Sequence, residues 1–214
     1  MIKLILFDMD GVLTDTEPLH YHCWKQAFME NGIDLDYETY KPCIGSTREF
    51  LCNLILKAYG IDFRKDPSVR DRMNELKAQY IDQNGLPQID GVEEVVRTLY
   101  ERGYTLAVVS SSPLESIQFN METLELSQYF SLLFSCEQVP HPKPAPDGFL
   151  EAASRLQIPP EKCLVIEDSY NGICSAKAAG MTCLGFQNPG SGDQDLYAAD
   201  QIFHSFRDIL TLVP

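Results

Sequence analysis

The order of apolar and polar stretches along the chain predicts one early strand, then a block of helices, then an alternation of helices and strands. Residues 2–7 are apolar except for Lys3, a pattern typical of a strand buried on both faces of a parallel sheet. Three helices are expected next, with no strand between them: about 16–31, 46–60 and 66–84. We therefore predict that residues 16–86 form a small helical domain inserted after the first strand.

Two local signals mark where these helices begin. Thr16 precedes Glu17 and Pro18, so its side chain is expected to cap the first helix. Ser46 has Glu49 three residues later, which is the spacing of a capping box at the start of the second helix.

From about residue 87 the pattern alternates between helix and strand. The expected strands are 106–109, 132–134, 163–166 and 182–186, and the expected helices are 92–102, one from 114, 148–156 and 170–179. Such alternation implies right-handed βαβ units. The predicted fold class is therefore α/β, a doubly wound, mainly parallel sheet built from residues 1–15 and 87–214, with the helical domain inserted. Residues 188–195 are expected to be a polar, Gly-rich loop.

Two carboxylates directly follow the first predicted strand. Asp8 and Asp10 are alternate residues of an extended segment, so their side chains are expected to face one site. Two such charges about 4 Å apart repel by roughly 4 kcal/mol at an effective dielectric near 20. A divalent cation would relieve this repulsion, and carboxylate oxygens suit Mg²⁺. A solvated acidic turn is the alternative, and residues 8–11 alone leave both interpretations open.

Polar groups also follow other predicted strands. Ser110 follows 106–109, and Glu167 with Asp168 follows 163–166. Each has an ordinary explanation, as a turn residue or as acids that complement a helix dipole. Ligands of open α/β sheets bind beyond the carboxyl ends of the strands. Convergence of several such ends therefore favours a functional site over the separate ordinary explanations.

Composition limits the classes of partner. The 214 residues carry a net charge of −14, which disfavours nucleic acid and anionic membranes as partners. No apolar run is long enough to span a bilayer, and the first residues lack the length and cleavage site of a signal peptide. The seven cysteines include no Cys-x-x-Cys pair and are expected to be reduced thiols. We expect a cytoplasmic monomer.

Four segments together give the chain a resemblance to the haloacid dehalogenase (HAD) superfamily, and within it to the β-phosphoglucomutase-like phosphatases. They are Asp8-Met9-Asp10-Gly11-Val12-Leu13-Thr14-Asp15-Thr16-Glu17, Ser110, the lysine segment 143–147, and the acidic segment 167–173. All four occur in the family's order, and the resemblance covers essentially the whole chain. One departure is Pro142, where many relatives have glycine; it alters the loop before Lys143 but keeps the cation.

The resemblance implies a catalytic role for each matching residue. Asp8 would be the nucleophile that forms an aspartyl phosphate, and Asp10 the general acid/base, a role that needs a raised pKa. Ser110, with Ser111 beside it, and Lys143 would bind the transferring phosphoryl group. The resemblance also implies Mg²⁺, held or oriented by Asp8, Asp10 through its backbone carbonyl, Glu167 and Asp168.

The inserted helices resemble the cap domain that covers the active site and selects substrate in these relatives. His20, Arg48 and Lys77 fall near positions that contact the sugar phosphate in β-phosphoglucomutases. Each also has an ordinary interpretation as a solvated helix residue. The preferred function is a phosphohydrolase of small phosphorylated metabolites, with sugar phosphates foremost. The alternative is a β-phosphoglucomutase, in which Arg48 would grip a second phosphate.

Other classes of protein fit the sequence less well. A non-enzymatic receiver domain would carry its acceptor aspartate after a later strand, whereas the strand 132–134 is followed by Ser135-Cys136-Glu137. Such a domain would also have no cap. Dehalogenation needs no acid two residues after the nucleophile. Phosphonate cleavage needs a Schiff-base lysine in the cap, for which Lys77 is a weak candidate.

Overall fold

The structure is a computed structural model that describes residues 1–213, apart from the side chain of Lys65. Its sheet has six strands, all parallel, in the order β3-β2-β1-β4-β5-β6. Pro214, the last residue of the predicted core segment, lies outside the described residues. The strands are β1 Leu4–Phe7, β2 Thr105–Ser110, β3 Leu132–Ser135, β4 Cys163–Glu167, β5 Thr182–Phe186 and β6 Gln201–Phe203. The predicted doubly wound parallel sheet is confirmed. Strand β6 was not predicted, because an edge strand of three residues is too short to show a pattern.

Nine α-helices accompany this sheet within residues 1–213. They are α1 Glu17–Met29, α2 Tyr37–Tyr40, α3 Arg48–Tyr59, α4 Ser68–Asn84, α5 Val92–Glu101, α6 Leu114–Thr123, α7 Asp147–Arg155, α8 Tyr170–Ala178 and α9 Ile209–Leu212. Single 3₁₀ turns lie at Lys41–Cys43, Phe63–Lys65, Ser127–Tyr129, Cys136–Gln138, Pro160–Lys162, Pro189–Ser191 and Phe206–Asp208. The one-turn helices α2 and α9 were not predicted, because one turn is too short to show a helical repeat.

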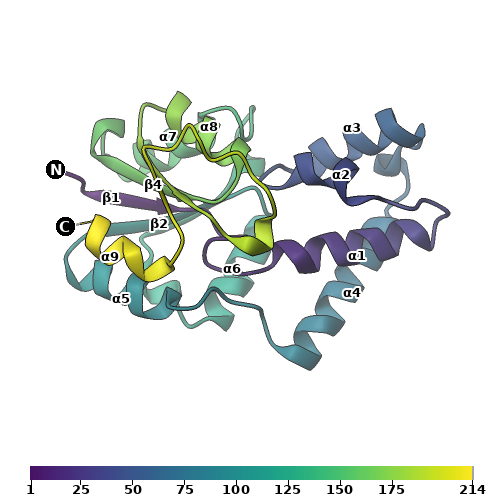
Figure 1. Ribbon diagram of the computed structural model, residues 1–214, viewed down its shortest axis with the longest axis horizontal. Coiled ribbons are helices and arrows are strands. Elements are labelled where there is room, and N and C mark those ends of the chain that lie inside the picture. Colours follow the sequence, from purple (N-terminus) through teal and green to yellow (C-terminus); the bar gives the residue numbers. More distant parts are fainter. Residues whose placement is uncertain (214) are drawn as a thin grey trace.

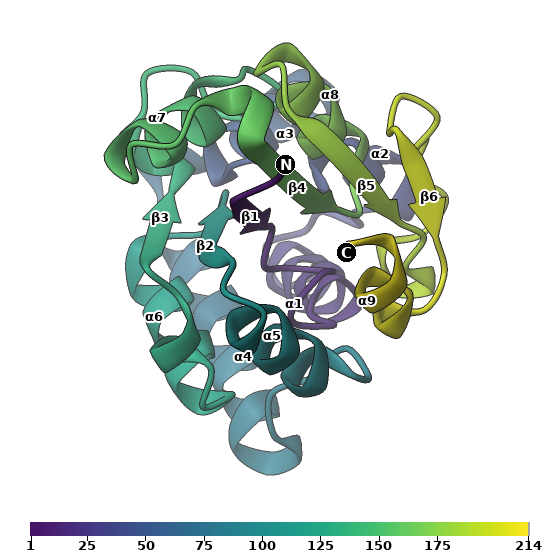
Figure 2. The ribbon, with the colours of Figure 1, turned by 90° about the vertical axis from the view of Figure 1, so that its left-hand side faces the viewer.

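Helices cover both faces of the sheet, and each face has its own hydrophobic core. Successive side chains of β1 point to opposite faces. Ile5 and Phe7 therefore join the core under α5, α6 and α9, whereas Leu4 and Leu6 join the core under α7 and α8. Figure 2 shows α7 and α8 on one side of the strands and α5 and α9 on the other. Because β1 is fully buried on both faces, its sequence is a continuous apolar run.

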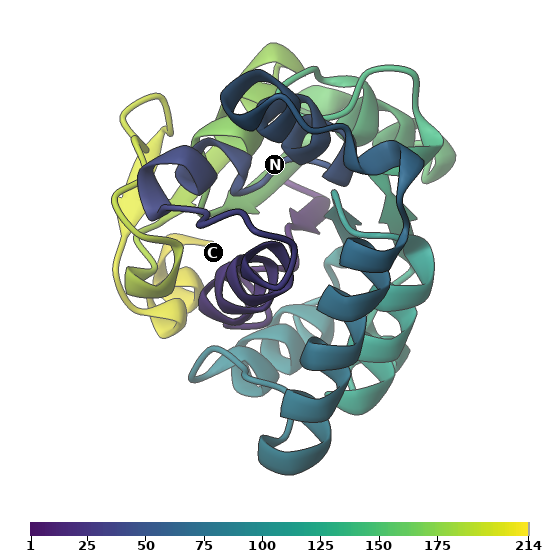
Figure 3. The same cartoon turned by 90° about the vertical axis from the view of Figure 1, so that its right-hand side faces the viewer.

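Helices α1 to α4 form a separate body beyond the sheet, around a third hydrophobic core (Figure 1). Phe28, Ile55 and Tyr40 are among its buried residues. Figure 3 shows these helices in front of the sheet. The two chain connections run side by side, since Asp15 N–H donates to Pro87 O at 3.0 Å. The inserted helical domain of the predicted fold class is therefore present, and its exact limits at 16 and 86 stay a prediction.

Both predicted helix caps are wrong, for the same physical reason. Thr16 precedes α1, but its hydroxyl makes no capping bond and donates to Asp10 instead. The residue before α3 is Thr47, which also makes no side-chain cap. The Ser46 hydroxyl instead accepts a hydrogen bond from Asn171 on α8 at 2.9 Å. In each case a tertiary partner takes the side chain that local spacing assigns to the helix end.

All seven cysteines are free thiols in this structure, and five of them are buried. No helix in residues 1–213 combines the length and apolar character that crossing a membrane would require.

Candidate active site

The carboxyl ends of the three central strands lie side by side and bring the predicted site residues together. Phe7, the last residue of β1, is paired with Val108 on one side and Ile166 on the other. Asp8 therefore emerges beside the ends of β2 and β4. The carboxylates of Asp8, Glu167 and Asp168 each offer an oxygen atom, and these atoms lie within 4.8 Å of one another.

Lys143 is buried in the middle of this acidic group. Its ammonium donates to Asp8 Oδ1 at 2.5 Å, to Glu167 Oε1 at 2.7 Å and to Val109 O at 3.0 Å. Burial would lower the pKa of Lys143, but Asp8 and Glu167 together raise it above the ordinary value, so the side chain stays charged. Pro142 therefore does not keep the lysine away from the acids.

The acids carry more negative charge than Lys143 offsets. Burial, with repulsion from Glu167 and Asp10, raises the pKa of Asp8 to about 8 despite Lys143. Burial and repulsion from Glu167 and Asp8 raise the pKa of Asp168 well above its usual range. Asp168 Oδ1 is buried and has no hydrogen-bond partner within the described residues 1–213. A buried carboxylate oxygen without a donor is costly. The donor set therefore fits a hard divalent cation such as Mg²⁺.

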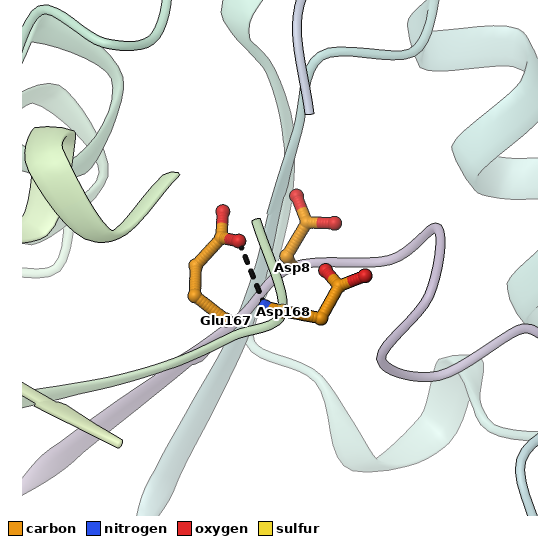
Figure 4. Close-up of side chains that lie close together, drawn as sticks. All are labelled: Asp8, Glu167 and Asp168. Carbon is orange, nitrogen blue, oxygen red and sulfur yellow. Dashed lines mark hydrogen bonds between the residues drawn. The ribbon is translucent and has the colours of Figure 1, made fainter. Parts of the chain in front are cut away.

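Glu167 differs from the other two acids in its hydrogen bonds. Its Oε2 accepts from the N–H of Asp168, the N–H of Ser169 and the Ser169 hydroxyl, while Oε1 accepts from Lys143. Figure 4 shows the Glu167 carboxylate turned toward Asp168 N, apart from the carboxylates of Asp8 and Asp168. Glu167 is therefore suited to orient Lys143 and the loop after β4 that contains Asp168 and Ser169. Asp8 and Asp168, in contrast, have oxygens available for a metal.

The Asp10 carboxylate lies in a different polar environment. It accepts hydrogen bonds from Thr16 Oγ1 at 2.5 Å and from Ser112 Oγ at 2.7 Å, and His20 Nε2 lies 3.8 Å from Oδ1. Burial would raise the pKa of Asp10, but His20, Lys77 and these hydroxyl donors lower it below its usual value. In this arrangement the ionised form of Asp10 is therefore favoured, and the raised pKa that the acid/base role requires stays a prediction for the closed site.

The serines at the end of β2 and directly after it, Ser110 to Ser112, lie at the same edge of the sheet. Ser110 is buried, and its hydroxyl accepts from Ser112 N–H at 3.0 Å. Ser111 donates to Gly45 O at 3.1 Å, a contact with the loop before α3. All three serines line the same cavity as Asp8.

That cavity measures about 1220 Å³ and lies between the strand ends and the inserted helices. Both Asp8 and Asp10 line it, as do the three predicted cap residues. Lys77 Nζ lies 2.8 Å from His20 Nε2, and Arg48 Nη2 lies 3.9 Å from Glu137 Oε1. Burial and Lys77 lower the pKa of His20 to about 4, against the opposing effect of Asp10.

Several residues at this site were not singled out from the sequence. Thr16 and Ser112 hold Asp10, Glu17 is a buried acid that lines the cavity, and the Ser191 hydroxyl donates to Asp168 Oδ2. The positions of Thr16, Glu17 and Ser112 beside predicted site residues were a usable signal. Ser191 gave none, because it lies in a polar loop far from the motifs.

Comparison with known proteins identifies the family. A family model described as haloacid dehalogenase-like hydrolase matches residues 5–186. The chain therefore belongs to the haloacid dehalogenase-like hydrolases, as an enzyme of the β-phosphoglucomutase-like phosphatase branch.

Two phosphatases and one solved structure illustrate which members of the family this chain is similar to. Fructose-1-phosphate phosphatase YqaB of Escherichia coli (strain K12) is 31% identical over 178 residues, which cover 83% of this chain and 92% of the relative. Hexitol phosphatase B of the same organism is 30% identical over 183 residues, covering 84% and 81%. The structure of β-phosphoglucomutase from Clostridium difficile matches with a TM-score of 0.83 at 25% identity, covering 98% and 93% of the two chains.

Proposed function

We propose that this enzyme is a Mg²⁺-dependent phosphohydrolase of small sugar or polyol phosphates that works through an aspartyl phosphate on Asp8. The observation that carries the proposal is Lys143 Nζ at 2.5 Å from Asp8 Oδ1, in a buried acidic group open to a large cavity. The relatives described as fructose-1-phosphate and hexitol phosphatases support this class of substrate. A cytoplasmic location and a monomeric state stay predictions.

In the first step, an Asp8 carboxylate oxygen attacks phosphorus and the bond to the leaving oxygen breaks. Attack by one anion on another requires compensation of charge, which Lys143 provides at Asp8 itself. Ser110 offers its hydroxyl at the same strand edge. Mg²⁺, when bound by Asp8, Asp168 and the Asp10 carbonyl, would supply further charge stabilisation for the phosphoryl group.

Asp10 handles the proton in both steps. A phosphate dianion at Asp8 adds negative charge near Asp10, which raises its pKa toward the protonated form that donates to the leaving alcohol. The resulting carboxylate then takes a proton from the water that attacks the aspartyl phosphate. The hydrogen bonds from Thr16 and Ser112 hold the carboxylate in one orientation for both transfers.

Release of inorganic phosphate from a panel of metabolites tests this function. With Mg²⁺, we expect phosphate release from several sugar and polyol monophosphates, and loss of that release after chelation with EDTA. The loss should be reversed by adding Mg²⁺ back. Full activity in EDTA would contradict the metal assignment, and no release from any sugar or polyol phosphate would contradict the substrate class.

A mutase is the second candidate, because the Arg48 guanidinium lines the cavity and its ion pair with Glu137 is long at 3.9 Å. That guanidinium could bind the far phosphate of a bisphosphate. Conversion of β-glucose 1-phosphate to glucose 6-phosphate, primed with the bisphosphate, distinguishes the two functions. A mutase would convert this substrate faster than it releases phosphate from any member of the panel.

Asp10→Asn is expected to reduce kcat about 10²- to 10⁴-fold and to leave the fold intact, because an amide cannot exchange the proton. Steady-state phosphate release measures the loss, and circular dichroism measures the fold. Asp34→Asn is the matched control, since Asp34 is exposed, pairs with Lys25 at 3.6 Å and does not belong to the lining of the cavity. Unchanged kcat in Asp10→Asn would refute the acid/base role.

A further inference from the structure

We propose that Ser191 is a positioning residue that orients Asp168 for metal binding, an inference that rests on the magnesium site of the proposed function. Ser191 ends the 3₁₀ turn Pro189–Ser191, in a loop outside the four segments that resemble the family. Residues 188–192 are called the strap below. Two observations carry the inference: the different states of the two Asp168 oxygens, and the anchoring of the strap to the turn after Asp10.

The first observation is the hydrogen bond itself. Ser191 is fully buried, and its hydroxyl donates to Asp168 Oδ2. The other oxygen, Oδ1, is also buried, and none of the described residues donates a hydrogen bond to it. Ser191 therefore binds one oxygen of Asp168 and leaves the other oxygen available to a cation. Asp168 belongs to the same acidic group as Asp8. A carboxylate oriented in this way presents a single defined oxygen to a cation.

The second observation is that the strap is fixed to the turn after Asp10. The Asn188 side chain accepts from Gly190 N–H at 2.9 Å and donates to Gly11 O at 3.0 Å and to Asp15 Oδ1 at 3.2 Å. It thus closes the strap on itself and ties it to the loop that follows the nucleophile. The hydrogen bonds of Asn188 therefore fix the position of the strap and, with it, the position of the Ser191 hydroxyl.

Close packing at Gly11 leaves Asp168 little freedom to move. Gly11 has φ +86°, and a Cβ built there would overlap Asp168 Oδ2 and would lie 2.7 Å from Ser191 Oγ. Backbone, carboxylate and hydroxyl therefore fill the same small space. Without the hydroxyl, Asp168 loses the one donor that residues 1–213 provide to Oδ2 and also part of this packing, so the carboxylate can turn toward other orientations.

Calorimetric titration of the protein with Mg²⁺ alone tests the inference. Ser191→Ala is expected to bind Mg²⁺ about 10- to 100-fold more weakly than the wild type, the range typical of a lost partner of a metal ligand. Ser127→Ala is the matched control, because it removes a buried hydroxyl that has no hydrogen-bond partner, in the turn before β3. The control is expected to keep wild-type affinity.

The melting temperatures of metal-free wild type and Ser191→Ala show whether a loss of Mg²⁺ affinity comes from a misplaced Asp168 or from a failure to fold. If Ser191→Ala does not fold, Ser191→Cys replaces it, since cysteine has the same shape with a somewhat larger atom and donates only weakly, and the same loss of affinity is expected. Wild-type affinity in the folded variant overturns the role of Ser191. Absence of Mg²⁺ binding by the wild type would instead overturn the metal site of the proposed function. A wild type that binds Mg²⁺ but releases no phosphate would leave the role of Ser191 intact and overturn the proposed activity.

Discussion

Replacing Asp8 by Asn is expected to lower kcat by about 10⁵-fold or more, since the reaction would lose the atom that attacks phosphorus. An amide oxygen is a far weaker nucleophile than a carboxylate. Phosphate release under saturating substrate measures the loss. Rapid acid quench with radiolabelled substrate should show label on the wild-type protein and none on Asp8→Asn.

The stability of Asp8→Asn is the control for this experiment. Burial and neighbouring acids raise the pKa of Asp8 to about 8 in the folded protein, from an ordinary value of 3.8. A carboxyl group whose pKa rises on folding destabilises the folded state as pH increases above the unfolded value. Asn carries no charge, and Lys143 keeps Glu167 as its buried partner, so the metal-free variant should melt no lower than the wild type. A folded variant within tenfold of wild-type kcat would contradict the nucleophile assignment.

Replacing Lys143 by Met is expected to cost about 3–5 kcal/mol in the free energy of unfolding and to abolish turnover. The cost is that of removing one partner from a buried ion pair. Asp8 and Glu167 would lose the cation that lies 2.5 and 2.7 Å from their oxygens. Urea denaturation of the metal-free protein measures the first effect, and phosphate release measures the second.

Magnesium and a surface lysine provide the controls for Lys143→Met. A cation that binds the folded state should restore part of the lost stability, because it replaces some of the missing positive charge. Lys57→Met, on the exposed side of α3, should change stability by less than about 0.5 kcal/mol. Wild-type stability in Lys143→Met would mean that the buried acids do not depend on this lysine.

The cap residues show where local sequence information ends. His20 and Lys77 are 57 positions apart, yet their nitrogen atoms lie 2.8 Å from each other and both line the cavity. The resemblance placed them near substrate, but only the packing of α1 against α4 explains their contact. Their roles toward substrate stay predictions.

By itself, the sequence determined the strands of the core, except β6, and the parallel α/β fold class. It could do so because a strand buried on both faces, such as Leu4–Phe7, must be apolar along its whole length. It also determined which acids stand at strand ends, since Asp8 and Glu167 adjoin or end apolar runs.

Only the tertiary structure decided the partners of those acids. Lys143 meets Asp8 across 135 positions, Ser112 meets Asp10 across 102, and Ser191 meets Asp168 across 23. Periodicity along a chain reports which side chains are buried. It does not report which distant donor forms a hydrogen bond with a given carboxylate oxygen, because the choice of donor depends on how loops from different strands pack together.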